Sequence, residues 1–154
     1  MTTNLSTDAR DSFAALLDAT GYTYLLKKQY KHAIALFTEA INLNSLRPHF
    51  WRHRMLAYIG ENMMVDALKD IDHCMALEGR TARMLLVRAK LNWKLGLRDR
   101  GNEDVSDAYK IDPSNEEVLL LWSLRKQTYP IRFLLMRDTY GTNPMKYTSE
   151  HARA

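Results

Sequence analysis

Two histidines, His49 and His53, stand four residues apart, a spacing at which one helix face can hold a zinc ion between two imidazoles. A zinc site normally has three or four protein ligands. Here no glutamate lies between the two histidines, and no cysteine or third histidine is near them in sequence. We therefore expect these side chains to pack or to form hydrogen bonds, and we expect neither a metal site nor a cofactor.

Cys74 follows His73 directly, and a thiol beside an imidazole is a candidate nucleophile with its base. Its position among small residues instead favours burial as a small apolar side chain. The chain contains no G-x-G-x-x-G, P-loop, G-x-S-x-G or H-E-x-x-H motif. These observations predict that the protein is not an enzyme.

The composition is typical of one globular domain: 154 residues, of which 46% are hydrophobic and 26% charged. Six glycines and four prolines are few for an all-β chain and favour helices. No apolar run approaches the roughly 18 residues of a membrane span, and residues 1–13 form a polar leader without the apolar core of a secretory signal. We therefore expect a cytoplasmic protein, whose net charge of +4 is too small to indicate nucleic-acid binding.

An internal repeat organises the sequence. The stretches AIALFTEAINLN, ALKDIDHCMALE and GNEDVSDAYKID begin at Ala33, Ala67 and Gly101, which are 34 residues apart. Extending this register divides the chain without insertion into the units 14–47, 48–81 and 82–115. Small residues recur where two helices would cross closely, and bulky residues recur beside them.

The register resembles that of the tetratricopeptide (TPR) family, whose pattern is W-x2-L-G-x2-Y, then A-x3-F, then P. Each landmark appears in at least one unit, at Trp51, Gly21, Tyr24, Phe37 and Pro113 among others. The third unit departs from the pattern, because Asn92 replaces an aromatic residue and Gly101 replaces a small helix former. The resemblance implies an all-α fold: a TPR superhelix (α-α solenoid) of three helix-turn-helix repeats plus a C-terminal capping helix.

Hydrophobic spacing predicts helix pairs over 12–28 and 30–43, 48–60 and 63–77, and 82–95 and 98–110. We expect a capping helix over 116–128, with Ser114 as its N-cap and Glu117 completing a capping box. Residues 129–154 are expected to form a short helix or an extended tail that docks on a partner.

In TPR proteins the first helix of each repeat lines a concave groove, and here the first helices of repeats two and three carry basic residues and no acid. The second helices carry most carboxylates, which predicts a basic groove and an acidic outer face. Candidate partner-binding residues of the groove are Tyr22, His49, Arg52, His53, Arg83, Lys90, Trp93 and Lys94.

Some TPR co-chaperones hold the acidic C-terminal tail of Hsp70 or Hsp90 with a clamp of lysine, asparagine and arginine side chains. The resemblance places the five clamp positions at Asp18, Tyr22, His53, Arg83 and Val87. Only Arg83 matches, and Asp18 would repel the ligand carboxylate. Binding of a chaperone C-terminal tail in this manner is therefore disfavoured.

The sequence thus predicts a non-catalytic protein-protein interaction adaptor whose basic groove binds an acidic or amphipathic segment of a larger partner. The alternative is a structural subunit of a large assembly, for example a ciliary or cytoskeletal one, anchored by residues 129–154. RNA binding is a weaker third hypothesis. The related helical repeats that read RNA typically form long arrays, whereas this chain has three repeats, and its net charge of +4 is small.

Overall fold

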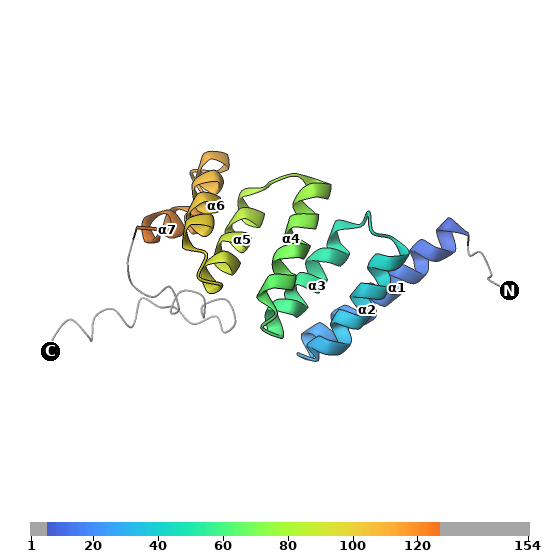
Figure 1. Ribbon diagram of the computed structural model, residues 1–154. Coiled ribbons are helices and arrows are strands. Elements are labelled where there is room, and N and C mark those ends of the chain that lie inside the picture. Colours follow the sequence, from blue (N-terminus) through green and yellow to red (C-terminus); the bar gives the residue numbers. More distant parts are fainter. Residues whose placement is uncertain (1–5, 127–154) are drawn as a thin grey trace.

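The computed structural model describes residues 6–126, which form a row of seven α-helices (Figure 1). Consecutive helices pair as antiparallel hairpins, and each hairpin packs on the next. The helices are α1 (Thr7–Leu26), α2 (Tyr30–Leu43), α3 (Pro48–Gly60), α4 (Met64–Glu78), α5 (Ala82–Lys94), α6 (Arg98–Ile111) and α7 (Glu116–Leu124).

The turn inside each hairpin recurs at the 34-residue period. Lys28, Asn62 and Gly96 all have positive φ, of 58°, 65° and 77°. In each turn the next residue donates its backbone N–H to a carbonyl five residues earlier, as in Gln29 to Tyr24 at 2.9 Å and Leu97 to Asn92 at 2.8 Å. This is the Schellman ending of a helix, which satisfies carbonyls that the helix itself leaves unpaired. The same backbone geometry therefore closes all three hairpins.

Ala33, Ala67 and Gly101 occupy the same place in α2, α4 and α6, each being the fourth residue of its helix. All three are buried where the second helix of a hairpin crosses the first. Each backbone N–H bonds at 3.1 Å to the carbonyl of the residue that precedes its helix. The 34-residue superposition expected from the sequence is thus present in three dimensions.

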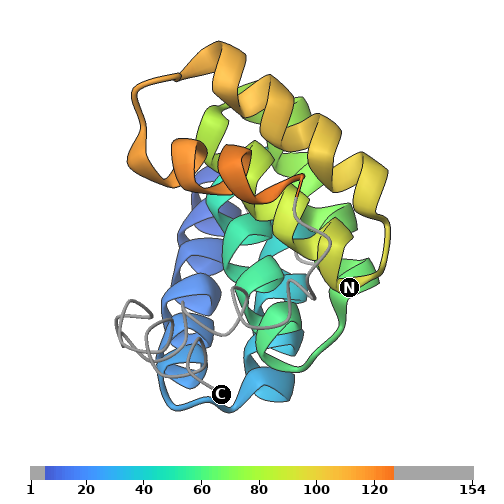
Figure 2. The same ribbon diagram turned by 90° about the vertical axis from the view of Figure 1, so that its left-hand side faces the viewer.

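The core runs along the row of helices between first and second members of the hairpins. Its largest fully buried side chains include Phe37, Phe50, Ile71, Leu85 and Val105. At the far end, Val118 and Leu121 of α7 join the cluster of the second and third repeats. Figure 2 looks from this end and shows α7 lying across the hairpin of α5 and α6.

Gly101 is needed because the ring of Trp93 lies directly against it. A Cβ at position 101 would come within 2.4 Å of two Trp93 ring atoms and 2.9 Å of the Ala89 carbonyl oxygen. Replacing Gly101 by alanine should therefore lower the free energy of unfolding by about 1–3 kcal/mol, although alanine is the better helix former by about 1 kcal/mol. Urea denaturation checks this against Arg100→Ala on the exposed side of α6. A Gly101→Ala protein that is more stable than the parent would contradict the packing described.

The start of α1 and the capping residue of α7 differ from the sequence prediction. α1 begins at Thr7, within the expected polar leader 1–13, because the hydroxyl of Ser6 accepts the N–H of Ala9 and caps the helix. α7 is capped by Asn115, whose side chain accepts from the N–H groups of Glu117 and Val118. The predicted cap Ser114 instead donates its hydroxyl to Asp112. Both differences arise because a neighbouring polar side chain was equally suited to capping.

The predicted tail, 129–154, lies outside the described residues, as does the end of the predicted capping helix. The described helix α7 ends at Leu124. Within residues 6–126, none of the helices combines the length and apolar character needed to span a bilayer.

Candidate functional site

The first helices of the three repeats, α1, α3 and α5, carry the candidate partner-binding residues. Successive residues of a helix are rotated by about 100°, so that Asp18 and Tyr22 share one face of α1, and His49, His53 and Leu56 share one face of α3. On α5 the corresponding line holds Arg83, Val87, Lys90 and Lys94. We call these three faces together the first-helix surface.

At the α1–α3 end of the first-helix surface the structure joins four of the expected positions around one carboxylate. Asp18 is buried, with one oxygen 2.8 Å from Nδ1 of His53 and the other 4.0 Å from Nε2 of His49. The Tyr22 ring lies 5.0 Å from the His53 ring, and Phe37 packs on its other side at 5.6 Å. This polar cluster occupies the place where a chaperone-tail clamp would hold lysine and asparagine.

The charge state of His49 follows from its surroundings. Burial lowers the pKa of His49 below its ordinary value of 6.5, while the facing carboxylate of Asp18 acts in the opposite direction. The neighbouring cations Arg52 and Arg47 and the imidazole of His53 add to the lowering. At pH 7 the His49 imidazole is therefore neutral. Among residues 6–126 no group of three or more metal-ligating side chains is suitably placed for a metal ion.

At the α5 end the surface is basic. Arg83 and Lys94 are exposed, and neither contacts a carboxylate of the described chain. Lys90, between them on the same line, pairs with Glu117 of α7 at 2.7 Å. Arg52 of α3 pairs with Glu78 at the end of α4. Two of the four predicted cations thus have their charge matched within the molecule, and Arg83 and Lys94 supply the positive potential.

Trp93, one of the predicted partner-binding residues, does not lie on the first-helix surface. It is 7% exposed, packs on Gly101 and donates its indole N–H to Asn102 at 3.2 Å. Trp93 stands one residue before Lys94 and therefore points about 100° away from it, toward α6. Its ring belongs to the core of the third hairpin and offers no exposed area to a partner.

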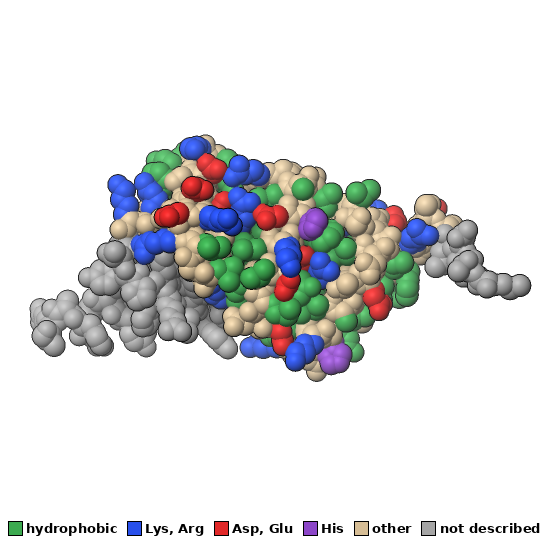
Figure 3. Space-filling view, in the orientation of Figure 1, with side chains coloured by type: hydrophobic (Ala, Val, Ile, Leu, Met, Phe, Trp, Pro, Cys, Tyr) green, Lys and Arg blue, Asp and Glu red, His purple; other side chains and the backbone are tan. Residues whose placement is uncertain are grey.

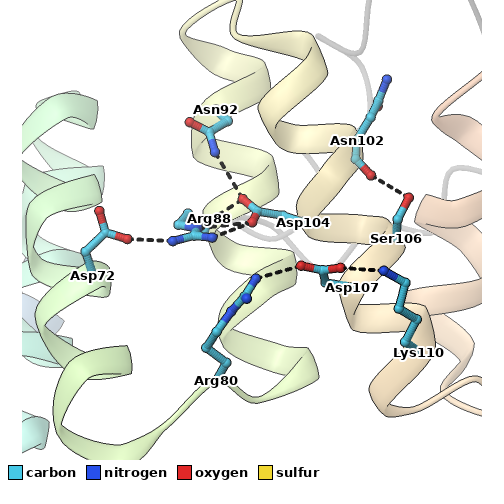
Figure 4. A network of polar contacts seen from close by, with 9 residues as sticks. All are labelled: Asp72, Arg80, Arg88, Asn92, Asn102, Asp104, Ser106, Asp107 and Lys110. Carbon is cyan, nitrogen blue, oxygen red and sulfur yellow. Dashed lines mark hydrogen bonds and ion pairs between the residues drawn. The ribbon is translucent and has the colours of Figure 1, made fainter.

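The sequence places basic residues on first helices and acidic residues on second helices. In the structure, several of these opposite charges pair with one another between helices. Arg54 of α3 forms a bidentate pair with Asp70 of α4, at 2.7 and 2.9 Å, and donates to Thr38 of α2 at 3.1 Å. Arg88 of α5 bonds Asp104 of α6 at 2.6 Å and Asp72 of α4 at 2.8 Å (Figure 4). The opposite charges therefore meet at helix contacts, and Figure 3 shows them interspersed over the face it presents.

These two arginines form one repeated device. Arg54 and Arg88 are 34 residues apart, as are Asp70 and Asp104. Each arginine reaches the second helix of its own hairpin and the second helix of the preceding hairpin. Asp70 and Asp104 are 1% and 4% exposed, so the pairs lie inside the array. Sequence reasoning counted both arginines only among the basic residues of the first helices and missed the pairs, although the matching 34-residue spacing of both partners was the available signal.

Cys74 is fully buried, with its Sγ 3.5 Å from the carbonyl oxygen of Pro48. Burial raises the pKa of its thiol to about 12, which removes nearly all reactive thiolate near neutral pH. We expect the native protein at pH 8 to react with Ellman's reagent at least about 100-fold more slowly than the urea-unfolded protein. Equal rates in the two states would contradict the burial of this side chain.

The chain has relatives of known sequence, but it spans only 12% and 17% of the length of two that it matches. It is 28% identical over 99 residues (64% of this chain) to U-box domain-containing protein 70 of Oryza sativa subsp. japonica. It is 31% identical over 103 residues (67% of this chain) to the heat shock protein sti1 homolog of Schizosaccharomyces pombe. No family model matches the chain.

Solved structures share the arrangement of helices. The TPR domain of Arabidopsis OM64 superimposes with a TM-score of 0.69 at 18% identity, covering 78% of this chain and 99% of that domain. The first TPR of Spaghetti (RPAP3), bound to the HSP90 peptide SRMEEVD, gives 0.68 at 20% identity and covers 76% and 93% of the two chains. These likenesses establish the fold.

Stacked helical hairpins of one length define the described chain as an α-solenoid, a class that acts through its surfaces. With its 34-residue period and these structural neighbours, the described part of the chain has the tetratricopeptide-repeat fold.

Proposed function

We propose that the first-helix surface binds an acidic segment of a larger partner protein, and that the chain acts as an adaptor. The observation that carries this proposal is the pair Arg83 and Lys94, which are exposed on one line of α5 and have no described carboxylate partner. An arginine can hold a carboxylate with two hydrogen bonds. Lys94, about three turns further along α5, offers a second positive charge to another carboxylate of the same segment.

The rest of the surface supplies apolar area, which favours an amphipathic segment. Tyr22 is 41% exposed and Leu56 is 44% exposed, on α1 and α3. Aromatic and arginine side chains together are typical of residues that dominate binding energy at interfaces. The bound segment would place its carboxylates at α5 and its apolar side chains toward α1 and α3.

Chaperone tails are a second candidate, because the structural neighbour Spaghetti (RPAP3) is bound to an HSP90 peptide that ends in EEVD. The residues of this chain weigh against the same mode of binding. Asp18 stands where the clamp has a lysine, and His53 holds its carboxylate in place at 2.8 Å. A tail carboxylate at that point would meet a negative charge, so we propose a different acidic segment as the ligand.

Pairs of peptides test the proposal. Each acidic peptide, SRMEEVD included, is compared with a version in which glutamine and asparagine replace its glutamate and aspartate. Fluorescence anisotropy with the full chain should show tighter binding of acidic members, with affinities that fall as salt is raised. Equal binding of both members of every pair would overturn the proposal. If SRMEEVD binds at least as tightly as every other acidic peptide, the result would instead favour a chaperone tail as the ligand.

We also place the protein in the cytoplasm. The chain has a single cysteine, and a buried thiol without a disulfide partner is suited to a reducing compartment.

A further inference from the structure

α3 has a second face, which carries aromatic and basic side chains. Trp51 and Tyr58 point about 140–180° away from His49 and His53, and Arg54 points about 100–140° away from them, since successive residues are rotated by about 100°. With residues of α4 they line a cavity of about 260 Å³. This volume is below the roughly 300–1,000 Å³ of small-molecule pockets, and it suits a single large side chain.

Three aromatic rings, those of Trp51, Tyr58 and His73, line this cavity, which we call the α3–α4 pocket. The Trp51 ring stacks on the imidazole of His73, with 4.2 Å between ring centres. The guanidinium of Arg54 lies 5.1 Å from the centre of the Trp51 ring and 5.4 Å from that of Tyr58. Trp51 is fixed by donating its indole N–H to the carbonyl of Ser45 at 2.9 Å. The Trp51 ring is therefore held in this position by contacts within the protein itself.

The charges around the pocket are matched in pairs. Arg54 bonds both oxygens of Asp70, and Lys69 bonds Asp66 at 2.9 Å. Burial raises the pKa of Tyr58 above its ordinary value, so its phenol is neutral at pH 7. A charged occupant would find no uncompensated charge of opposite sign, whereas an uncharged ring would meet a lining made largely of aromatic rings and one flat guanidinium.

The pocket belongs to the middle repeat. In the third repeat, Leu85 and Asn92 replace Trp51 and Tyr58 in the register, and both are buried, with exposures of 0% and 5%. The pocket therefore arises from the aromatic residues themselves and does not follow from the repeat fold alone.

We propose that the α3–α4 pocket receives an uncharged aromatic side chain of a partner protein. Trp51, Arg54 and Tyr58 are the residue types that most often dominate interface energies, and such residues insert into or surround pockets of the partner. The protein then binds on two opposite faces of α3, with an acidic segment on one and an aromatic anchor on the other. This proposal does not depend on the first-helix surface.

The test uses the full chain and N-acetyl-tryptophanamide as the probe, followed by 15N NMR. We expect saturable shifts centred on Trp51, Tyr58, Asp70 and His73, with a Kd of about 1–10 mM, which is ordinary for one anchoring side chain. N-acetyl-leucinamide and N-acetyl-argininamide should bind at least about fivefold more weakly. Tighter binding of the arginine derivative, or shifts that do not saturate, would overturn the proposal.

Two histidine variants test whether the probe binds in the α3–α4 pocket or stacks on imidazole rings elsewhere on the protein. His73→Ala removes the imidazole that stacks on Trp51 and should weaken the probe at least about threefold. His32→Ala removes an exposed imidazole that stacks on Tyr24 at 5.4 Å and should leave the Kd unchanged. An equal effect of both variants, or of neither, would count against the α3–α4 pocket.

Discussion

Asp70→Ala should lower the free energy of unfolding by about 3–5 kcal/mol, the cost of leaving one charge of a buried pair uncompensated. Asp70 is 1% exposed and accepts two hydrogen bonds from Arg54, whose side chain is 14% exposed. Without the carboxylate, the guanidinium keeps only the hydroxyl of Thr38 as a hydrogen-bond partner at this contact. Urea denaturation followed by circular dichroism measures the loss.

A double variant provides the control. Arg54→Leu with Asp70→Leu removes both charges together and should recover most of the lost stability, since an apolar pair can replace a buried ion pair. Repeat one has Thr20 and Leu36 at these register positions and manages without an ion pair. A loss below about 1 kcal/mol for Asp70→Ala, as at an exposed pair, would show that this contact is not buried as described.

Grafting the clamp should create chaperone-tail binding. The four substitutions Asp18→Lys, Tyr22→Asn, His53→Asn and Val87→Arg, beside the native Arg83, should tighten the binding of SRMEEVD at least about 100-fold, or about 2.7 kcal/mol. The graft removes the carboxylate of Asp18 and adds donors that reach a terminal carboxylate. Fluorescence anisotropy against the parent chain measures the gain.

The matched control is the same graft with Asp18 retained, which should gain about tenfold or less, because Asp18 still repels the tail. Circular dichroism confirms that each variant keeps its helices. If the parent chain binds SRMEEVD as tightly as the full graft does, then the clamp positions do not determine recognition, and the chaperone tail becomes the preferred ligand.

Most of the fold could be predicted from the 34-residue repeat. Three landmarks at one spacing, Ala33, Ala67 and Gly101, were enough to place the hairpins, because small residues recur wherever helices cross closely. Helix ends were harder, since capping depends on which of several polar side chains reaches a free N–H. Ser6 and Asn115 were both suitable caps by residue type, and only the backbone path distinguishes Asn115 from Ser114.

The site was less predictable than the fold, because the positions of charged residues in the sequence do not show which of them form ion pairs. Arg52 and Lys90 were predicted as groove cations, and each has a carboxylate partner on another helix. Trp93 was placed on the groove by spacing from Lys90, and its burial follows from the missing side chain of Gly101 on α6. Contacts between different helices decide both outcomes, and the periodicity of one helix does not show which residues of another helix it meets.

The most direct test of the account is capture of partner proteins by the tagged full chain and by two charge-reversed variants. Arg83→Glu with Lys94→Glu reverses the basic line of α5, and Lys31→Glu with Arg100→Glu makes the same change in net charge on exposed second-helix positions. We expect the first variant to lose at least about tenfold of the specifically captured partner and the second to retain it. Equal capture by all three proteins would contradict a binding role for the first-helix surface.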